Sequence, residues 1–112
     1  MWHELDVEWR YRPDDPYAVR LDFGPATTGW LLSRETLAAG LRRPAGDGDV
    51  HVEPAEDGSV LVALIGRTGA ALLAAPAAAL ERFLAETEGL VPQGREPSWI
   101  DWEEGVRVLL SA

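Results

Sequence analysis

The sequence predicts an α+β fold in which antiparallel β-sheets come from two β-β-β-α pseudo-repeats, followed by a C-terminal helix. Three observations support this prediction. Polar and apolar residues alternate along residues 2–11 and 17–23, which is the period of a half-buried strand. Pro- and Asp-rich residues 12–16 separate these segments, as in a turn. Two short helical patterns, after Ser33 and from Pro76, each follow an apolar stretch that contains Leu-Leu.

The first half is expected to contain three strands and one helix. Residues 2–11 and 17–23 form a hairpin, and residues 27–32 return as a third strand. Ser33 is a suitable N-cap for the helix that follows, because its hydroxyl can accept a hydrogen bond from a free backbone N–H. Pro44 forbids continuation of that helix.

The second half repeats this plan. Residues 50–53 alternate as a strand, and residues 60–65 are apolar on both faces, which indicates a central strand or one covered by another subunit. Residues 70–73 complete a sixth strand. The following helix tolerates Pro76 in its first turn and ends at Gly89, a suitable residue just past a helix end. The chain is interpreted as a degenerate duplication, similar in topology more than residue by residue.

The C-terminal residues 98–112 are best interpreted as a third helix behind a linker that is rich in proline and glycine. Asp101 and Glu104 have the spacing of a capping box, and Trp102 begins the apolar face. The length of 112 residues suits one compact domain, so residues 1–112 are expected to form a single domain.

Composition limits the class of partner. The net charge is −9, with ten Arg, no Lys and nineteen acidic residues. Nucleic-acid binders usually carry a basic patch, so the charge argues against DNA or RNA as the main partner and leaves a protein with a basic surface open. The chain contains no Cys, which excludes disulfides and thiolate zinc sites. Because no segment resembles a signal peptide or a membrane span of about 20 apolar residues, the expected location is cytoplasmic.

We expect no catalytic residue, metal ion or cofactor. Asp49, His51 and Glu53 project from one strand face and could hold a divalent cation, but a single imidazole among carboxylates is more typical of a solvated strand. The other histidine, His3, has no reason to lie near them. Ser33 is interpreted as a cap and not a nucleophile, since two histidines leave little room for a Ser-His-Asp triad.

Two pairs of adjacent carboxylates could do acid–base chemistry: Asp14-Asp15 and Glu103-Glu104. Carboxylates that are neighbours in a turn or at a helix start are usually solvated, and some of them cap the helix. We therefore expect these two pairs to be structural and exposed.

Four residues are candidates for a partner interface: Trp2, Trp99, Arg42 and Arg43. Exposed aromatic side chains mark interfaces, and the alternative is that these tryptophans cover the edge of the core or pack on the terminal helix. Arg42-Arg43 falls at a helix C-terminus, where positive charge is favourable in any case; a phosphate site is the functional alternative. Trp30 is expected in the core.

Several segments occur in an order that is similar to a known family. They are Asp15-Pro16-Tyr17-Ala18-Val19, Trp30, Arg34 with Leu37, Gly40-Leu41-Arg42-Arg43-Pro44, Gly46, Gly48-Asp49-Val50, Val52, Pro54, Gly69, Leu72-Leu73, Ala75-Pro76, Leu80, Phe83-Leu84, Thr87, Val91-Pro92 and Gly94. The pattern resembles the SsgA-like proteins of actinomycetes, regulators of sporulation-specific cell division. The similarity runs from about Arg12 to the terminal helix.

The resemblance implies a small non-enzymatic protein at sporulation septa that helps to position or assemble FtsZ, the tubulin-like division protein, or controls septal peptidoglycan remodelling. It also implies a fold similar to the Whirly single-strand-binding fold, and a homo-oligomer, trimer or dimer. The partners would be FtsZ or another SsgA-like protein, and the protein would be cytoplasmic and recruited to the division septum. The family offers no catalytic residues to carry over.

This chain departs from the family pattern at its start. Members usually have another strand ahead of the region that matches residues 7–11. Three explanations are open: the strand is lost, residues 2–11 replace it, or the start codon lies upstream.

The leading hypothesis is an adaptor for cell division and sporulation that works through protein–protein contacts. The alternative is a single-stranded nucleic-acid-binding protein on a Whirly-like scaffold, whose binding would disappear with modest added salt. A third class, a hydrolase or metal enzyme, depends on His51 and a few carboxylates, and unchanged thermal stability with Zn²⁺ or Mn²⁺ would argue against its metal version.

Overall fold

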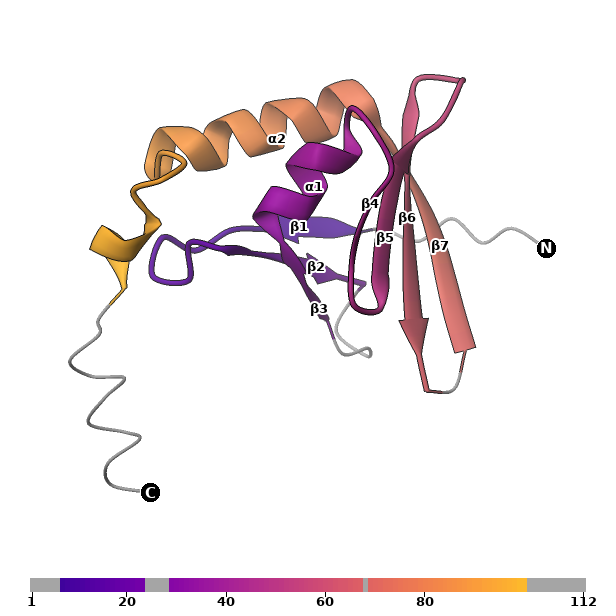
Figure 1. Ribbon diagram of the computed structural model, residues 1–112, viewed down its shortest axis with the longest axis horizontal. Coiled ribbons are helices and arrows are strands. Elements are labelled where there is room, and N and C mark those ends of the chain that lie inside the picture. Colours follow the sequence, from indigo (N-terminus) through magenta and orange to yellow (C-terminus); the bar gives the residue numbers. More distant parts are fainter. Residues whose placement is uncertain (1–6, 24–28, 68, 101–112) are drawn as a thin grey trace.

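The computed structural model describes residues 7–23, 29–67 and 69–100. Its elements in chain order are β1 (Glu8–Arg10), β2 (Ala18–Asp22), β3 (Trp30–Ser33), α1 (Arg34–Gly40), β4 (Ala45–Asp47), β5 (Val50–Pro54), β6 (Ser59–Gly66), β7 (Gly69–Pro76), α2 (Ala77–Leu90) and the 3-10 helix η1 (Glu96–Trp99). The fold is α+β with antiparallel sheets, as the sequence predicts (Figure 1).

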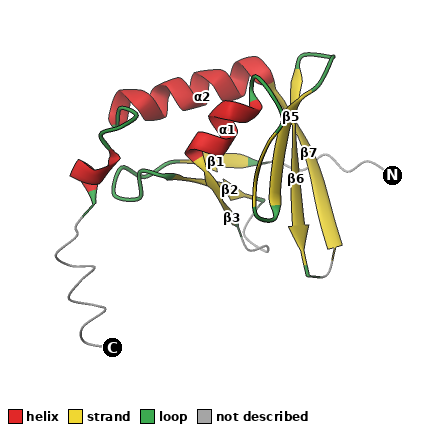
Figure 2. Ribbon diagram, in the orientation of Figure 1, coloured by secondary structure: helices red, strands yellow, loops and turns green. Residues whose placement is uncertain are grey.

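The strands form two antiparallel sheets. The first sheet has the order β1-β2-β3 and the second the order β4-β5-β6-β7. Figure 2 shows the strands of the two sheets running in different directions, with α2 lying along the first sheet and α1 between α2 and the second sheet. Helix α1 packs against β3, β4 and β5, and α2 packs against β7 and α1. Helix α1 therefore contacts both sheets, and α2 packs on α1.

The core follows the alternation of each strand. In β6, Val60, Val62 and Leu64 are buried, while the residues between them are partly exposed. The same period buries one face of β2 and of β5. The buried apolar residues form one cluster: Val19, Leu21, Leu32, Leu37, Val50, Val52, Val60, Val62, Leu64, Leu80 and Leu84. Trp30, which is expected in the core, is partly buried and packs against this cluster from outside. The ring centroids of Trp9 and Phe83 are 6.2 Å apart, so β1 contacts α2.

Two local predictions are confirmed. Ser33 is the N-cap of α1, because its Oγ accepts a hydrogen bond from the N–H of Thr36 at 3.1 Å. β6 is a central strand that pairs with β5 on one side and β7 on the other. This pairing satisfies both edges of the strand, while Leu61 and Ala63 on its outer face are only partly buried.

The prediction of three strands in the second half is wrong. Residues Ala45–Asp47 form the additional strand β4, which pairs with β5 around a tight turn at Gly48. The φ of Gly48 is +60°, which glycine adopts without steric cost. The second half is therefore β-β-β-β-α. In the first half, β1 pairs only over Glu8–Arg10, and the earlier part of predicted strand 2–11 lies outside the described residues.

Both predicted helix ends in the second half differ from the structure. α2 continues through Gly89 to Leu90, because the N–H of buried Val91 still bonds to the carbonyl of Thr87 at 2.9 Å. Pro76 belongs to β7 and is the N-cap of α2. Of the predicted C-terminal helix 98–112, residues 101–112 lie outside the described residues, and its first two residues belong to the short 3-10 helix η1 (Glu96–Trp99).

Gly40 allows α1 to approach the second sheet closely. The residue is buried, and a Cβ placed on it would lie 2.5 Å from the Cβ of Val52 on β5. No side chain fits between the helix and the strand at this point. The glycine that weakens the last turn of α1 thus makes the contact between helix and sheet possible.

We predict that Gly40→Ala lowers the free energy of unfolding by about 1–3 kcal/mol through overpacking against Val52. Gly89→Ala is the matched control, because Gly89 also lies in a helix but nothing is within 4 Å of a Cβ there. Gly89→Ala should raise the free energy of unfolding by about 0.5–1 kcal/mol, because alanine stabilises a helix relative to glycine. Urea unfolding of the three proteins measures both effects, and a gain in stability in both variants would contradict the close contact.

Candidate partner interface

Arg34 is a buried cation at the start of α1. Its side chain is 7% exposed. Nη1 donates hydrogen bonds to the carbonyls of Val91 at 2.8 Å and Thr87 at 3.3 Å, and Nη2 donates to Oε2 of Glu96 at 2.9 Å. The first helix is therefore tied to the end of α2 and to η1.

The same arginine is tied to the turn between β1 and β2. Its guanidinium carbon lies 5.2 Å from the centroid of the Tyr11 ring, a cation–π contact. The Tyr11 hydroxyl donates to the carbonyl of Pro16 at 2.8 Å, and the Arg34 N–H donates to the carbonyl of Tyr17 at 2.8 Å. Burial raises the pKa of the Tyr11 hydroxyl, so this group is a neutral donor.

Glu96 is the carboxylate partner of this network. Three groups hold the pKa of the Glu96 carboxyl below its ordinary value: the backbone N–H of Glu96 itself, the Arg34 guanidinium and the N–H of Gly94. Burial acts in the opposite direction and raises this pKa. The bond from the Gly94 N–H to Oε1 is 2.6 Å long. Both oxygens of the buried carboxylate are thus paired.

A groove lies between the two helices, and we call it the helix groove. It consists of adjoining hollows of about 510 Å³ and about 90 Å³, which share Glu35, Ala38, Glu88 and Gln93. Arg42 and Arg43 line the larger hollow, and Tyr17 lines the smaller one. Tyr17 is 50% exposed, so an aromatic side chain stands at the other end of the groove from the two arginines.

Small side chains line much of the larger hollow. They are Ala38, Ala39, Ala77 and Ala85, together with Leu41 and Leu84. Glu35, Glu81 and Glu88 contribute negative charge to the same lining. Small residues allow the backbone of a partner to come close. The charged residues around them favour a partner that places charges of opposite sign beside them.

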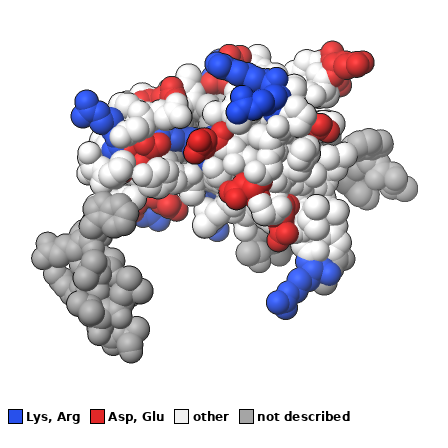
Figure 3. All heavy atoms as spheres, viewed as in Figure 1, with Lys and Arg blue, Asp and Glu red and all other residues white. Residues whose placement is uncertain are grey.

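Arg42 and Arg43 follow Leu41, the C-cap of α1, and are exposed. Their backbone N–H groups both bond to the carbonyl of Ala39, which ends the helix. Within the described parts of the chain, neither side chain forms an ion pair. Figure 3 shows basic side chains gathered where α1 ends, beside α2. These two cations are therefore available to a partner's carboxylates.

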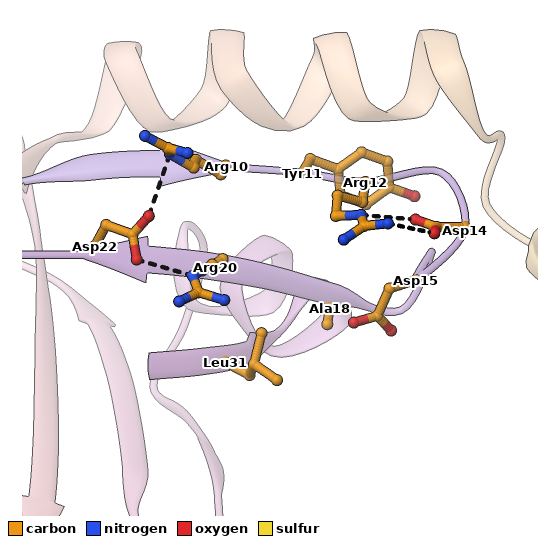
Figure 4. Close-up of a pocket in the computed structure, with 9 residues that line it drawn as sticks. All are labelled: Arg10, Tyr11, Arg12, Asp14, Asp15, Ala18, Arg20, Asp22 and Leu31. Atoms are coloured by element: carbon orange, nitrogen blue, oxygen red, sulfur yellow. Dashed lines mark hydrogen bonds and ion pairs between the residues drawn. The ribbon is translucent and has the colours of Figure 1, made fainter. Parts of the chain in front are cut away.

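Another hollow, of about 700 Å³, lies on the outer face of the first sheet (Figure 4). Its arginines are already paired. Asp22 accepts from Arg10 at 3.2 Å and from Arg20 at 2.8 Å, and Arg12 contacts Asp14 at 2.6 Å. A nucleic-acid strand would have to displace these carboxylates, so the face does not resemble a basic groove.

The other candidates from the sequence do not join the helix groove. Trp99 is 47% exposed on η1 but does not line the groove, and Trp2 lies outside the described residues. Asp14 and Asp15 are exposed turn residues. His3, Glu103 and Glu104 also lie outside the described residues.

The proposed metal ligands do not come together as a set. Nε2 of His51 lies 3.6 Å from Oε2 of Glu53 on β5, but in the described residues no group of three or more His, Cys, Asp or Glu side chains is placed to hold a metal ion. Asp49 is therefore not a third member of such a group.

Sequence reasoning missed Tyr17 and Arg34 as site residues. The only signal for either was that they occur in the segments that resemble the family. Nothing in the local pattern near Arg34 indicates that its partner is Glu96, because the two residues are 62 positions apart.

The structure is that of a small α+β protein. Its helix groove is lined by the buried pair of Arg34 and Glu96 and by Arg42 and Arg43, which form no ion pair with the described residues. Among the described side chains, no group is placed to hold a metal ion. The family model described as Streptomyces sporulation and cell division protein, SsgA, matches residues 5–96. The chain therefore belongs to the SsgA-like family of sporulation and cell division proteins.

Relatives of established name are similar over most of the chain. The sporulation-specific cell division protein SsgB of Streptomyces coelicolor is 43% identical over 108 residues, covering 91% of this chain and 79% of the relative. SsgB of Thermobifida fusca is 38% identical over 107 residues, covering 90% and 78%. These names describe cell division proteins and specify no enzymatic reaction.

Solved structures agree with the fold. An SsgA-like sporulation-specific cell division protein from Thermobifida fusca has a TM-score of 0.79 at 37% identity, covering 92% of this chain and 80% of that one. A structure described as "Mutations in SsgB correlate to longitudinal cell division during sporulation of Streptomyces coelicolor" has a TM-score of 0.75 at 44% identity, covering 81% and 76%. Among the described helices, none has the length and apolar character needed to cross a membrane.

We predict that Arg34→Met destabilises the fold by about 3–5 kcal/mol, because it leaves the Glu96 carboxylate buried without its cation. Arg12→Met is the matched control: Arg12 pairs with Asp14 at the surface, where its side chain is 77% exposed. Loss of an exposed pair costs at most about 1 kcal/mol. Equal losses in urea unfolding would contradict the role of the buried pair.

The stability should also depend on pH through Glu96. Its pKa is lower in the folded state than its ordinary value of 4.5, so its contribution is present above that value and is lost as the pH falls through the folded pKa. The stability difference between the unchanged protein and Glu96→Gln should therefore shrink as the pH is lowered below 4.5. Unfolding free energies measured between neutral and acid pH test this, and a constant difference would contradict it.

Proposed function

We propose that this protein is a non-enzymatic regulator of sporulation-specific cell division. It acts in septum site selection or assembly through protein–protein contacts with the FtsZ machinery. The observation that carries the proposal is the match to the SsgA family along residues 5–96, supported by relatives named as sporulation-specific cell division proteins. The protein is cytoplasmic in this proposal and is recruited to the division septum.

The helix groove is the proposed contact with the division partner. Its alanines leave room for a partner segment to lie between α1 and α2. Arg42 and Arg43 offer two cations without an ion pair in the described residues of an acidic chain, so we assign them to carboxylates of the partner. Tyr17 would cover the other end of the bound segment.

The alternative is a single-stranded nucleic-acid binder. Two antiparallel sheets that are each followed by a helix support a Whirly-like arrangement. The charges do not support nucleic-acid binding, since Arg10, Arg12 and Arg20 are each paired with a carboxylate. We therefore favour the protein partner.

We predict that a fluorescent fusion expressed at native level in a differentiating culture forms foci or ladders that coincide with or precede labelled FtsZ rings. Changing Arg42→Glu together with Arg43→Glu should disperse the foci, because the new carboxylates repel the partner's. Arg82→Glu with Arg95→Glu is the matched control: it changes the net charge equally, and neither residue lines the helix groove. The control should localise like the unchanged protein.

Diffuse or nucleoid signal from the unchanged fusion at every stage would contradict the proposed role in division. If septal foci persist after Arg42 and Arg43 are changed, the division function stands, but the helix groove is not the contact with the partner. Thermal unfolding of both double variants should be measured to verify that they fold like the unchanged protein.

A further inference from the structure

The two ends of the helix groove carry different side chains. The smaller hollow, of about 90 Å³, lies where α1 begins and α2 ends, and Tyr17, Glu35 and Glu88 are among its lining residues. The larger hollow extends to the end of α1 and the start of α2, and its lining includes Arg42 and Arg43. Figure 1 shows α1 ending beside the start of α2. The groove therefore runs along α1 from one set of side chains to the other.

The end at the smaller hollow is acidic. Arg34 lines this hollow, but its charge is cancelled by Glu96, because the two form a buried ion pair at 2.9 Å. Two exposed carboxylates remain, those of Glu35 and Glu88, and within the part of the chain that the structure describes neither forms an ion pair. One belongs to α1 and the other to α2, so negative charge borders the hollow from both helices.

An aromatic ring lies at the same end. Tyr17 lines the smaller hollow with half of its surface exposed, and its backbone carbonyl accepts a hydrogen bond from the N–H of Arg34 at 2.8 Å, which holds it beside the start of α1. Gln93 adds an amide oxygen that can accept a hydrogen bond. A ring with carboxylates and an amide attracts an ammonium or guanidinium group and repels a carboxylate.

The other end of the groove is basic. Arg42, Arg43 and Glu81 are the charged residues, among those described, that line the larger hollow alone, so positive charge exceeds negative charge there. Ala38 lies between the two ends and leaves the middle of the groove open. Arg42 follows Glu35 by seven positions, and a rise of about 1.5 Å per residue separates the two ends by about 10 Å along α1.

We propose that the helix groove binds a dipolar segment of the partner, with an Arg or Lys side chain in the smaller hollow and an acidic side chain about 10 Å away at Arg42 and Arg43. This inference rests on the proposed function of the groove and adds the charge pattern of the partner. Residues three positions apart in an extended segment, or seven apart in a helix, have a separation of about 10 Å. A segment that is acidic throughout would meet Glu35 and Glu88 with like charge.

A tetrapeptide with blocked ends, Arg-Ala-Ala-Glu, has this charge pattern and serves as the probe. Its binding to the isotope-labelled protein is measured at low salt from NMR chemical shifts. Citrulline replaces the arginine in one neutral analogue, and glutamine replaces the glutamate in the other. The Kd of the probe should be about fivefold lower than that of either analogue, which is the scale of contacts made by exposed charges and rings. The shifts should centre on the residues that line the helix groove.

Neutral variants of the protein assign each preference to one end of the groove. Glu35→Gln with Glu88→Gln should lose the preference for arginine over citrulline and keep the preference for glutamate over glutamine. Arg42→Gln with Arg43→Gln should do the reverse. All four side chains are exposed, so both double variants should fold.

Glu56→Gln with Glu86→Gln is the matched control for the acidic pair. It changes the net charge equally, both residues are exposed, and neither lines the helix groove. This double variant should bind the probe and its analogues like the unchanged protein.

Co-sedimentation with polymerised FtsZ separates this inference from the proposed function. Glu35→Gln with Glu88→Gln should weaken co-sedimentation two- to fivefold in Kd, because the partner loses the contact of its basic residue. Stronger co-sedimentation would mean that the partner is acidic at both ends, which overturns the dipolar partner and leaves the contact with FtsZ intact. If the unchanged protein does not sediment with FtsZ but the peptide preferences hold, the contact with FtsZ fails and the dipolar specificity of the groove stands.

Three results with the peptides would overturn the proposal. One is an equal Kd for the probe and its citrulline analogue. Another is a set of chemical shifts that centres away from the helix groove. The third is a preference for arginine that survives Glu35→Gln with Glu88→Gln.

Discussion

The buried ion pair between Arg34 and Glu96 is the constraint on which the rest of the structure depends. It joins the first residue of α1 to η1, across 62 positions of sequence, and the same guanidinium bonds to carbonyls at the end of α2. Removing two charges from water is costly, so such a pair is weak evidence for stability in itself. Its value here is positional: it holds the two helices and the β1–β2 turn in one arrangement.

That arrangement shapes the surface proposed for the division partner. α1 has only seven residues and is too short to be stable alone, so its position depends on packing. Arg34 fixes its beginning and Gly40 lets its end rest against Val52. Arg42 and Arg43 follow Leu41, the C-cap of α1, and line the helix groove. The residues that fix the helix therefore also set where these two arginines lie.

Sequence predicted the parts of the fold that depend on local patterns. The alternation of β2 and β6 and the cap at Ser33 are local, and the structure confirms them. β4 was missed because Ala45–Asp47 is short and has no alternation of its own. The close contact of Gly40 with Val52 and the pair of Arg34 with Glu96 are contacts across the fold, so no local pattern indicates them. Arg42 and Arg43 could be recognised as surface cations, but the groove beside them exists only once α1 and α2 are packed.

The most direct test of the central claim is co-sedimentation of the purified protein with polymerised FtsZ of the source organism. If the helix groove binds a division partner of this kind, the unchanged protein should pellet with the polymers and saturate as its concentration rises. The protein with Arg42→Glu and Arg43→Glu should stay in the supernatant at the same concentrations. An unchanged protein that remains in the supernatant throughout would contradict direct binding to FtsZ, and with it the partner assigned to the groove.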